Sequence, residues 1–192
     1  MNDGAAIFRP AVFMDRDGTL NHDESYIHKF EEFRWIDRVP EALAQLKRAG
    51  LALVVVTNQS GVNRGYYDRQ DLLKLHREVG QDLLARVGVK IDGWYFCPHN
   101  PLTDNCDCRK PAPGMLIQAT KDLFLDPAES YMVGDKFLDV QAGLAMGVKR
   151  TILVLTGYGE SERKYVSSDT LIVNNFPEAA EYILNDFSAS RA

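Results

Sequence analysis

Asp15 and Asp17 stand two positions apart, directly after the apolar run Ala11–Met14. The run predicts a buried strand, so both carboxylates lie at its carboxyl end, where open α/β sheets bind ligands. A carboxylate there can attack as a nucleophile if one neighbour neutralises its charge and another moves protons. The alternatives are an acidic turn and a calcium loop. An EF-hand loop is excluded, because Phe13 and Tyr26 occupy positions that need oxygen ligands.

Three further motifs lie next to predicted elements. Thr57–Gly61 follows an aliphatic run and offers a hydroxyl and successive backbone amides, which can hold phosphate oxygens. Arg109–Pro111 places two cations ahead of a predicted helix, and Gly134–Asp139 contains two acids, Asp135 and Asp139, on one face of a first helical turn. Mg²⁺ takes one or two carboxylates and leaves its other positions to water and phosphate. Taken singly, these motifs could also be a turn, a solvated basic pair and an acidic helix start.

Strand-like and helix-like segments alternate along the chain. Continuous apolar runs predict strands at 11–15, 51–57, 93–97, 130–134, 151–156 and 171–173. Helical spacing and capping residues predict helices at 40–49, 68–87, 112–124, 137–146 and 177–186. This alternation predicts an α/β fold with a doubly wound, mostly parallel sheet. We expect a single domain at 1–187, a disordered tail at 188–192, and no separate cap domain, because one helix and one strand occupy the interval 61–97.

Composition limits the classes of partner. With 45% hydrophobic and 26% charged residues the chain is ordinary for a globular protein, and its net charge of -5 argues against broad nucleic-acid binding. The run 51–56 is too short to span a bilayer, and the first ten residues lack the apolar segment of a signal peptide. We therefore expect a cytoplasmic protein with no membrane partner. No long apolar face is left over for an obvious dimer, so we expect a monomer.

A short loop carries four potential zinc ligands. They are three cysteines and a histidine: Cys97, His99, Cys106 and Cys108. Such a set matches a closed tetrahedral structural site, which leaves no open position for catalysis by the metal. The alternative is three buried or reactive thiols beside an unrelated histidine. Because Cys108 directly precedes Arg109 and Lys110, the metal is expected to fix the base of a phosphate-binding lysine.

The order of the four motifs resembles that of the haloacid dehalogenase-like phosphatases, over essentially the whole chain. The resemblance implies that Asp15 is the nucleophile, forming an aspartyl-phosphate, and that Asp17 is the general acid and base. It implies that Thr57 and Lys110 stabilise the phosphoryl oxygens. Mg²⁺ would be held by Asp15, Asp135 and the main-chain carbonyl of Asp17. Asp139 would orient a metal-bound water or the side chain of Lys136.

The zinc loop inside this pattern resembles a narrower family, the D-glycero-D-manno-heptose 1,7-bisphosphate 7-phosphatases. Asn21, Asp23, Tyr26–His28 and Arg64–Gly65 also look like the pattern of that family. The resemblance implies removal of the 7-phosphate of a small sugar bisphosphate, in the synthesis of nucleotide-activated heptose for lipopolysaccharide. The histidinol-phosphate phosphatases share the zinc loop and are the alternative. A non-catalytic zinc-stapled binding module would need every catalytic position to be intact by chance.

The same resemblance implies a set of substrate contacts. By position they are Asp23, Glu24, Ser25, Tyr26, Thr57, Asn58, Gln59, Ser60, Arg109, Lys110 and Lys136. Ser25 departs from the family pattern, which commonly has glycine there. A polynucleotide 3′-phosphatase is a chemical relative, but the acidic charge and the lack of an aromatic and basic stripe count against it. His76 lies on the apolar face of the longest predicted helix, where we expect a satisfied buried side chain.

Overall fold

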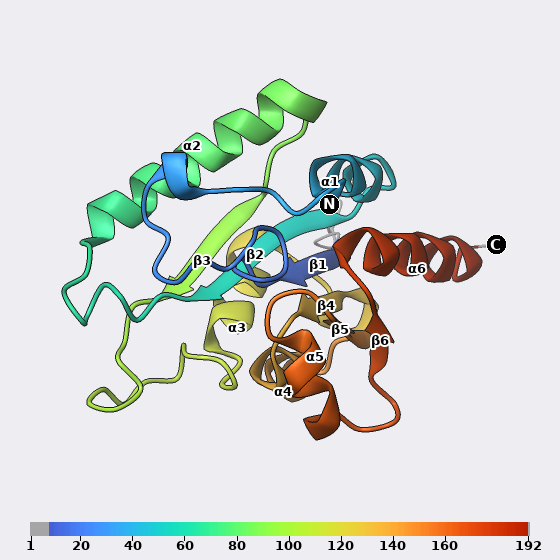
Figure 1. The fold of residues 1–192 in the computed structure, drawn as a ribbon. Helices are drawn as coiled ribbons and strands as arrows, with labels where there is room; N and C mark the ends of the chain where they lie inside the picture. The colour runs from blue at the N-terminus through green and yellow to red at the C-terminus, as the bar shows by residue number, and fades with distance from the viewer. Residues whose placement is uncertain (1–7, 192) are drawn as a thin grey trace, which may run out of the picture.

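The computed structural model describes residues 8–191, which contain a six-stranded parallel sheet (Figure 1). Its order is β3-β2-β1-β4-β5-β6, and every neighbouring pair is parallel. The strands are β1 (Ala11–Met14), β2 (Ala52–Asn58), β3 (Gly93–Cys97), β4 (Tyr131–Gly134), β5 (Arg150–Val154) and β6 (Leu171–Val173). This confirms the predicted fold class.

Helices cover both faces of the sheet. One face carries α1 (Val39–Arg48), α2 (Arg69–Val87) and α6 (Phe176–Ala189), and the other carries α3 (Gly114–Leu123) and α4 (Phe137–Met146) (Figure 1). A short helix, α5 (Gly159–Glu162), follows β5. Each layer of helices buries its own apolar cluster against the sheet, and β1 is completely buried between the two. Burial on both faces explains why the strands are continuously apolar.

The strand order places the predicted motifs together. From β1 the chain extends the sheet through β2 to β3, and later returns to the other side of β1 with β4. A crevice forms where the winding reverses, at the carboxyl ends of the strands. Asp15, Thr57 and Asp135 end or follow β1, β2 and β4, which are neighbours in the sheet. Three motifs far apart in sequence therefore meet at one edge.

Capping residues set the starts of two helices near this edge. Asp68 and Asp71 exchange side-chain and backbone hydrogen bonds of 2.9 and 3.0 Å at the start of α2. At the start of α4, the carboxylate of Asp139 accepts a 2.9 Å hydrogen bond from the backbone N–H of Lys136. Acceptors in the first turn satisfy N–H groups that have no partner within the helix. The cap at α4 thus fixes Asp139 beside the sheet edge.

The structure differs from the predicted elements most clearly after β5 and at the end of the chain. The helix α5 was not predicted, because four residues show no hydrophobic period. The last helix, α6, runs to Ala189, so residues 188 and 189 are helical where a disordered tail was predicted. Phe187, only 5% exposed, packs in the core, and this packing holds the end of the helix in place. Residue 192 lies outside the described residues, among which no helix is both long and apolar enough to cross a membrane.

Candidate active site and metal centres

The carboxyl edge of the sheet holds a cavity of about 330 Å³. Every predicted substrate contact lines it except Glu24, which is exposed outside the lining. Sequence reasoning missed four lining residues, which are Gly61, Tyr67, Leu138 and Tyr158. Gly61 and Leu138 lie inside recognised motifs but were not singled out, whereas Tyr67 and Tyr158 lie outside them, where no spacing pattern marked them. The volume suits a small molecule, and the lining combines acidic, basic and aromatic side chains.

Lys110 and Asp15 form a buried ion pair on the cavity wall. The Lys110 ammonium lies 2.9 Å from Oδ1 of Asp15 and also donates to the carbonyl oxygen of Val56, at 2.7 Å. The two residues are 2% and 5% exposed. Burial lowers the pKa of Lys110, but the charges of Asp139 and Asp15 outweigh it and raise the pKa overall. Lys110 therefore stays charged and neutralises the carboxylate predicted to be the nucleophile.

Asp139 contacts a different lysine from the one predicted. Its Oδ1 lies 2.6 Å from the ammonium of Lys110, whereas only the backbone N–H of Lys136 reaches its other oxygen. Asp139 thus contacts Lys136 through its backbone and not through its side chain, and the predicted contact with a metal-bound water stays a prediction. The side chain of Lys136 instead lies 3.6 Å from Asp135 and 3.8 Å from Asp23. Sequence spacing could place Asp139 on a helix face but could not rank the two lysines within its reach.

The carboxylate of Asp17 is held by four donors. Arg16 binds both oxygens, at 3.0 and 2.9 Å, and Asn21 and Gln59 donate at 3.1 and 2.8 Å. Burial raises the pKa of Asp17, but the charge of Arg16 and these hydrogen bonds outweigh it and hold the pKa below 3.8. The carboxylate is thus ionised. The motif spacing predicted Asp17 but gave no sign of the residues that orient it.

Two residues predicted to bind substrate, Asn58 and Gln59, also make hydrogen bonds within the protein. The amide of Gln59 donates to Asp17 and to Thr57 Oγ1 (2.9 Å) and accepts a 2.6 Å hydrogen bond from the hydroxyl of Tyr67. Asn58 exchanges two 3.1 Å hydrogen bonds with the backbone of Lys110. Both side chains line the cavity, yet their polar atoms are used within the protein. Thr57 still has its own hydroxyl proton for a phosphoryl oxygen.

Asp15, Asp135 and Asp139 form a buried group that could hold a metal ion, with ligand oxygens within 4.8 Å of one another. Asp135 is fully buried, and its Oδ1 has no hydrogen-bond partner within residues 8–191. Burial and the neighbouring carboxylates, opposed by Lys136, raise the pKa of Asp135 to about 8. A hard cation would relieve this excess of negative charge and supply the missing partner. The group therefore fits Mg²⁺ at Asp15 and Asp135, while both oxygens of the neighbouring Asp139 are bonded to Lys110 and Lys136.

Two glycines make room for this group. Gly18 and Gly157 both have positive φ, of 82° and 57°, and a Cβ at either position would clash with the Asp135 carboxylate. Glycine satisfies both needs, because it tolerates the left-handed conformation and has no side chain. The backbone N–H of Tyr158, just after Gly157, donates to Asp135 at 2.9 Å. Two loops therefore close tightly around the buried carboxylate.

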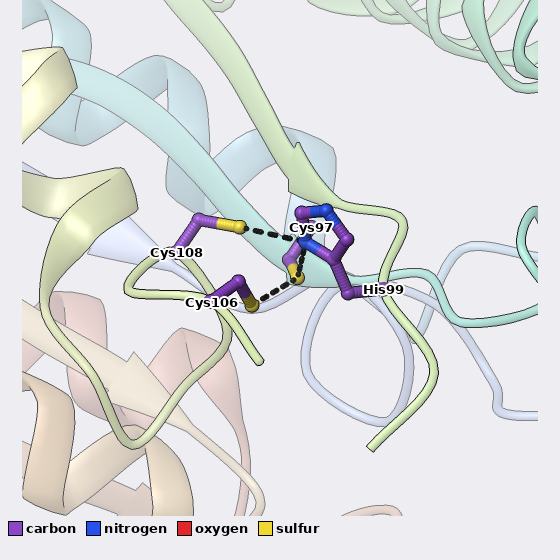
Figure 2. Close-up of side chains that lie close together, drawn as sticks. All are labelled: Cys97, His99, Cys106 and Cys108. Atoms are coloured by element: carbon purple, nitrogen blue, oxygen red, sulfur yellow. Dashed lines mark hydrogen bonds between the residues drawn. The ribbon is translucent and has the colours of Figure 1, made fainter. Parts of the chain in front are cut away.

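The predicted zinc ligands converge. Figure 2 shows Cys97, at the end of β3, facing His99 and the two cysteines of the returning chain. Cys97 and Cys106 have their sulfurs 3.7 Å apart, and Nδ1 of His99 lies 3.4 and 3.2 Å from the sulfurs of Cys97 and Cys108. Tetrahedral Zn–S bonds place two sulfurs about 3.8 Å apart. The four residues therefore fit a closed zinc site (Figure 2).

The zinc loop is tied to the cavity at two points. Arg109, next to Cys108, donates to the backbone carbonyl of His99 at 3.3 Å. On its other side, Asp104 accepts a 2.8 Å hydrogen bond from Asn63, in the turn that precedes α2. The loop thus supports both the Arg109–Lys110 pair and the turn beside it. The predicted effect of zinc on the position of Lys110 stays a prediction.

A second loop closes the cavity mouth. Ser25 and Tyr26 both adopt left-handed backbone, with φ of 59° and 56°. Such geometry costs a non-glycine residue about 1–2 kcal/mol. The hydroxyl of Tyr26 accepts a 3.0 Å hydrogen bond from Arg64, and its ring meets that of Tyr66 edge-on. These contacts join the loop to the turn before α2.

A parallel α/β sheet with these carboxylates, this hydroxyl and this lysine at its switch point defines a haloacid dehalogenase-like phosphatase. The family model described as HAD-hyrolase-like matches residues 107–179. More specifically, the chain belongs to the D-glycero-β-D-manno-heptose-1,7-bisphosphate 7-phosphatase family. It is 44% identical to the member from Haemophilus ducreyi over 180 residues, covering 91% of this chain and 98% of that protein.

Two further comparisons agree. The Escherichia coli K12 member of that family is 47% identical over 154 residues, which cover 77% of this chain and 80% of that protein. The crystal structure of D,D-heptose 1,7-bisphosphate phosphatase from B. bronchiseptica, complexed with magnesium and phosphate, superposes with a TM-score of 0.85 at 32% identity. That match covers 92% of this chain and 99% of the other. The sequence-based recognition of the family is therefore confirmed.

Proposed function

We propose that this protein removes the 7-phosphate of D-glycero-β-D-manno-heptose 1,7-bisphosphate, by way of an aspartyl-phosphate on Asp15. The names of its relatives support the substrate and its β anomer. The observation that carries the chemistry is the Lys110 ammonium held between Asp15 and Asp139 beside a cavity of about 330 Å³. A neutralised carboxylate at a strand end is poised to attack an anionic phosphate.

In the first step, an oxygen of Asp15 attacks phosphorus and the bond from phosphorus to the sugar oxygen breaks. Asp17, ionised in the free protein, takes up one proton from solvent when the phosphate binds and donates it to that leaving oxygen, so that the sugar departs as an alcohol. Lys110 and Thr57 stabilise the charge on the phosphoryl oxygens. Arg109 and Lys136, which also line the cavity, bind the rest of the substrate by charge.

In the second step, water attacks the phosphorus of the aspartyl-phosphate. Asp17, now ionised, takes a proton from that water, and the carboxylate of Asp15 is released with inorganic phosphate. The low pKa of Asp17 favours this second role. Splitting the hydrolysis in two replaces one difficult displacement with two easier ones.

Two metals complete the proposal. Asp15, Asp135 and the main-chain carbonyl of Asp17 would hold Mg²⁺, which would supply Lewis-acid stabilisation of the phosphoryl oxygens. Zn²⁺, held by three cysteines and a histidine, has no position left for water or phosphate and acts on structure alone. We also propose that residues 1–187 form one domain, which acts as a monomer, to be checked by light scattering. A cytoplasmic location is supported by the three free thiols gathered at the zinc site.

The test is phosphate release from a panel of phosphate monoesters. It includes both anomers of the heptose bisphosphate and histidinol phosphate, with Mg²⁺ present. We expect the highest kcat/KM for the β anomer and a loss of about 10⁴-fold or more in Asp15→Asn. The variant is checked by mass spectrometry for deamidation back to aspartate and by circular dichroism for folding. A higher kcat/KM for histidinol phosphate would identify that compound as the substrate instead. Near-normal activity of Asp15→Asn would refute the covalent mechanism.

A further inference from the structure

Arg16 is a buried charge that the catalytic steps above do not use. It is 1% exposed and one of the largest fully buried side chains. Its guanidinium grips Asp17 through two parallel hydrogen bonds, from Nε to Oδ1 and from the terminal nitrogen to Oδ2, at 3.0 and 2.9 Å. A bidentate interaction of this kind fixes both the orientation of the carboxylate plane and its position. Arg16 thus dictates how the Asp17 carboxylate is aimed.

The far side of Arg16 is braced by α2. A guanidinium has no acceptor, so the 3.3 Å contact with Nε2 of His76 is a hydrogen bond from Arg16 to an unprotonated ring nitrogen. Burial, and then the charge of Arg16, lower the pKa of His76 well below 6.5, so the ring is neutral. It stacks on Trp94 of β3, with centroids 4.6 Å apart. His76 is buried and bonded at Nε2, as expected, while its Nδ1 has no partner among the described residues.

Arg16 also reaches the loop at the cavity mouth. The terminal nitrogen that binds Asp17 also donates to the carbonyl oxygen of Ile27, at 3.0 Å. Ile27 is buried and directly follows Ser25 and Tyr26, which line the cavity. One rigid group therefore connects the proposed proton donor to the loop proposed to contact the sugar.

From these contacts we infer that Arg16 is a positioning residue: it aims the Asp17 carboxylate at the leaving oxygen and ties that aim to the loop ending at Ile27. The inference rests on the proposed role of Asp17 as proton donor. Arg16 does not line the cavity, so it acts on the substrate only through its partners. Lysine cannot replace it, because a single ammonium lacks the planar fork that fixes both carboxylate oxygens.

Leaving groups of different basicity separate this role from a general loss of structure. A sugar alkoxide departs only with a proton, whereas a nitrophenolate is stable enough to leave without one. Misaiming Asp17 therefore slows the sugar phosphate more than p-nitrophenyl phosphate. A variant that merely reduces the folded fraction lowers both rates by the same factor. The ratio of the two kcat values is thus insensitive to stability.

The experiment compares Arg16→Met and Arg16→Lys with the unaltered protein on both substrates. We expect Arg16→Met to lower kcat about 10²-fold for the heptose bisphosphate and less than about 10-fold for p-nitrophenyl phosphate. KM should rise for the sugar only, through the Ile27 contact. Arg16→Lys should show the same selective loss, because it restores charge without the fork. Lys47→Met, which breaks the partly buried pair with Asp92 far from the site, is the control and should leave the ratio unchanged.

Two outcomes would overturn the inference, and they differ. Asp17→Asn provides the reference: if it shows no preference for the better leaving group, the proposed role of Asp17 fails and the inference with it. If Asp17→Asn is selective but Arg16→Met slows both substrates equally, only the inference on Arg16 fails. If Arg16→Met does not fold, His76→Leu is used instead, because it removes the hydrogen bond from Arg16 to His76 and leaves the contacts of Asp17 intact. It should then give a selective loss of about 3- to 10-fold, and an equal loss on both substrates would refute the inference.

Discussion

The ammonium of Lys110 lies 2.6 Å from a carboxylate oxygen of Asp139, on the first turn of α4. A second carboxylate, that of Asp15, lies 2.9 Å from the same ammonium. All three groups are almost completely buried. The lysine is therefore held by a structural acid on one side while it neutralises the proposed nucleophile on the other.

Replacing Asp139 by asparagine should misplace Lys110 without unwinding α4. The amide oxygen can still accept the hydrogen bond from the backbone of Lys136, so the cap is kept while the ion pair is lost. We expect kcat to fall about 10- to 100-fold, because Lys110 is held less firmly against the phosphoryl group. Phosphate release and thermal unfolding of Asp139→Asn measure this. Unchanged kcat would show that Asp15 and Val56 suffice to place the lysine.

Removing the charge of Asp135 should lower the activity of the protein but raise its stability in the absence of Mg²⁺. Its carboxylate is buried beside two others, and its raised pKa, about 8, reflects that cost. After dialysis that removes Mg²⁺ but leaves zinc bound, we expect Asp135→Asn to unfold about 2–6 °C higher than the unaltered protein. Added Mg²⁺ should raise the Tm of the unaltered protein and hardly that of the variant. An equal rise in Tm for both proteins would show that Asp135 is not a ligand of Mg²⁺.

Zinc should act on catalysis through the position of Lys110. We expect Lys110→Ala to lower kcat about 10²- to 10³-fold with zinc still bound, and Cys108→Ala to lower kcat about 10-fold or more and also the Tm. In the double variant the losses should be far from additive, because both act through one lysine. Metal analysis confirms the zinc content of each protein. Fully additive losses would point to another route, of which the Asn63–Asp104 contact is the candidate.

Acid should weaken the contacts that hold α6 against the sheet. Asp186 of α6 accepts hydrogen bonds from Lys149 (2.7 Å) and Tyr131 of β4 (2.6 Å), which together lower its pKa below 3.8. The folded protein thus binds fewer protons here than the unfolded chain, so the stabilisation is present above about pH 4 and is lost as the pH falls through the lowered pKa. We expect Asp186→Asn to cost about 1 kcal/mol at pH 7.

Thermal unfolding at several pH values checks this prediction. The difference between Asp186→Asn and the unaltered protein, about 2–4 °C at pH 7, should shrink steadily below pH 4. Glu160→Gln is the matched control, because its pair with Arg163 is exposed and should contribute little at any pH. A difference that stays constant down to pH 2.5 would mean that the charge of Asp186 is irrelevant.

Much of this protein could be predicted from its sequence, because the signals are local. Continuous apolar runs between amphipathic segments require a parallel sheet covered on both faces, and strand ends in such a sheet share one edge. Hence Asp15, Thr57 and Asp135 could be placed together before any coordinates were known. Cysteine and histidine spacing on one loop likewise indicated the zinc site, which the structure brings together.

The partners of these groups were decided only by the tertiary structure. Asp139 bonds to Lys110 rather than to the side chain of Lys136, and Arg16 turns back to grip its own neighbour while reaching Ile27 and His76. Such contacts join segments tens of residues apart and depend on rotamers that packing selects. A spacing pattern gives the face on which a side chain lies. Which of several charges it meets there depends on burial, since an unpaired charge in the core costs far more than one in water.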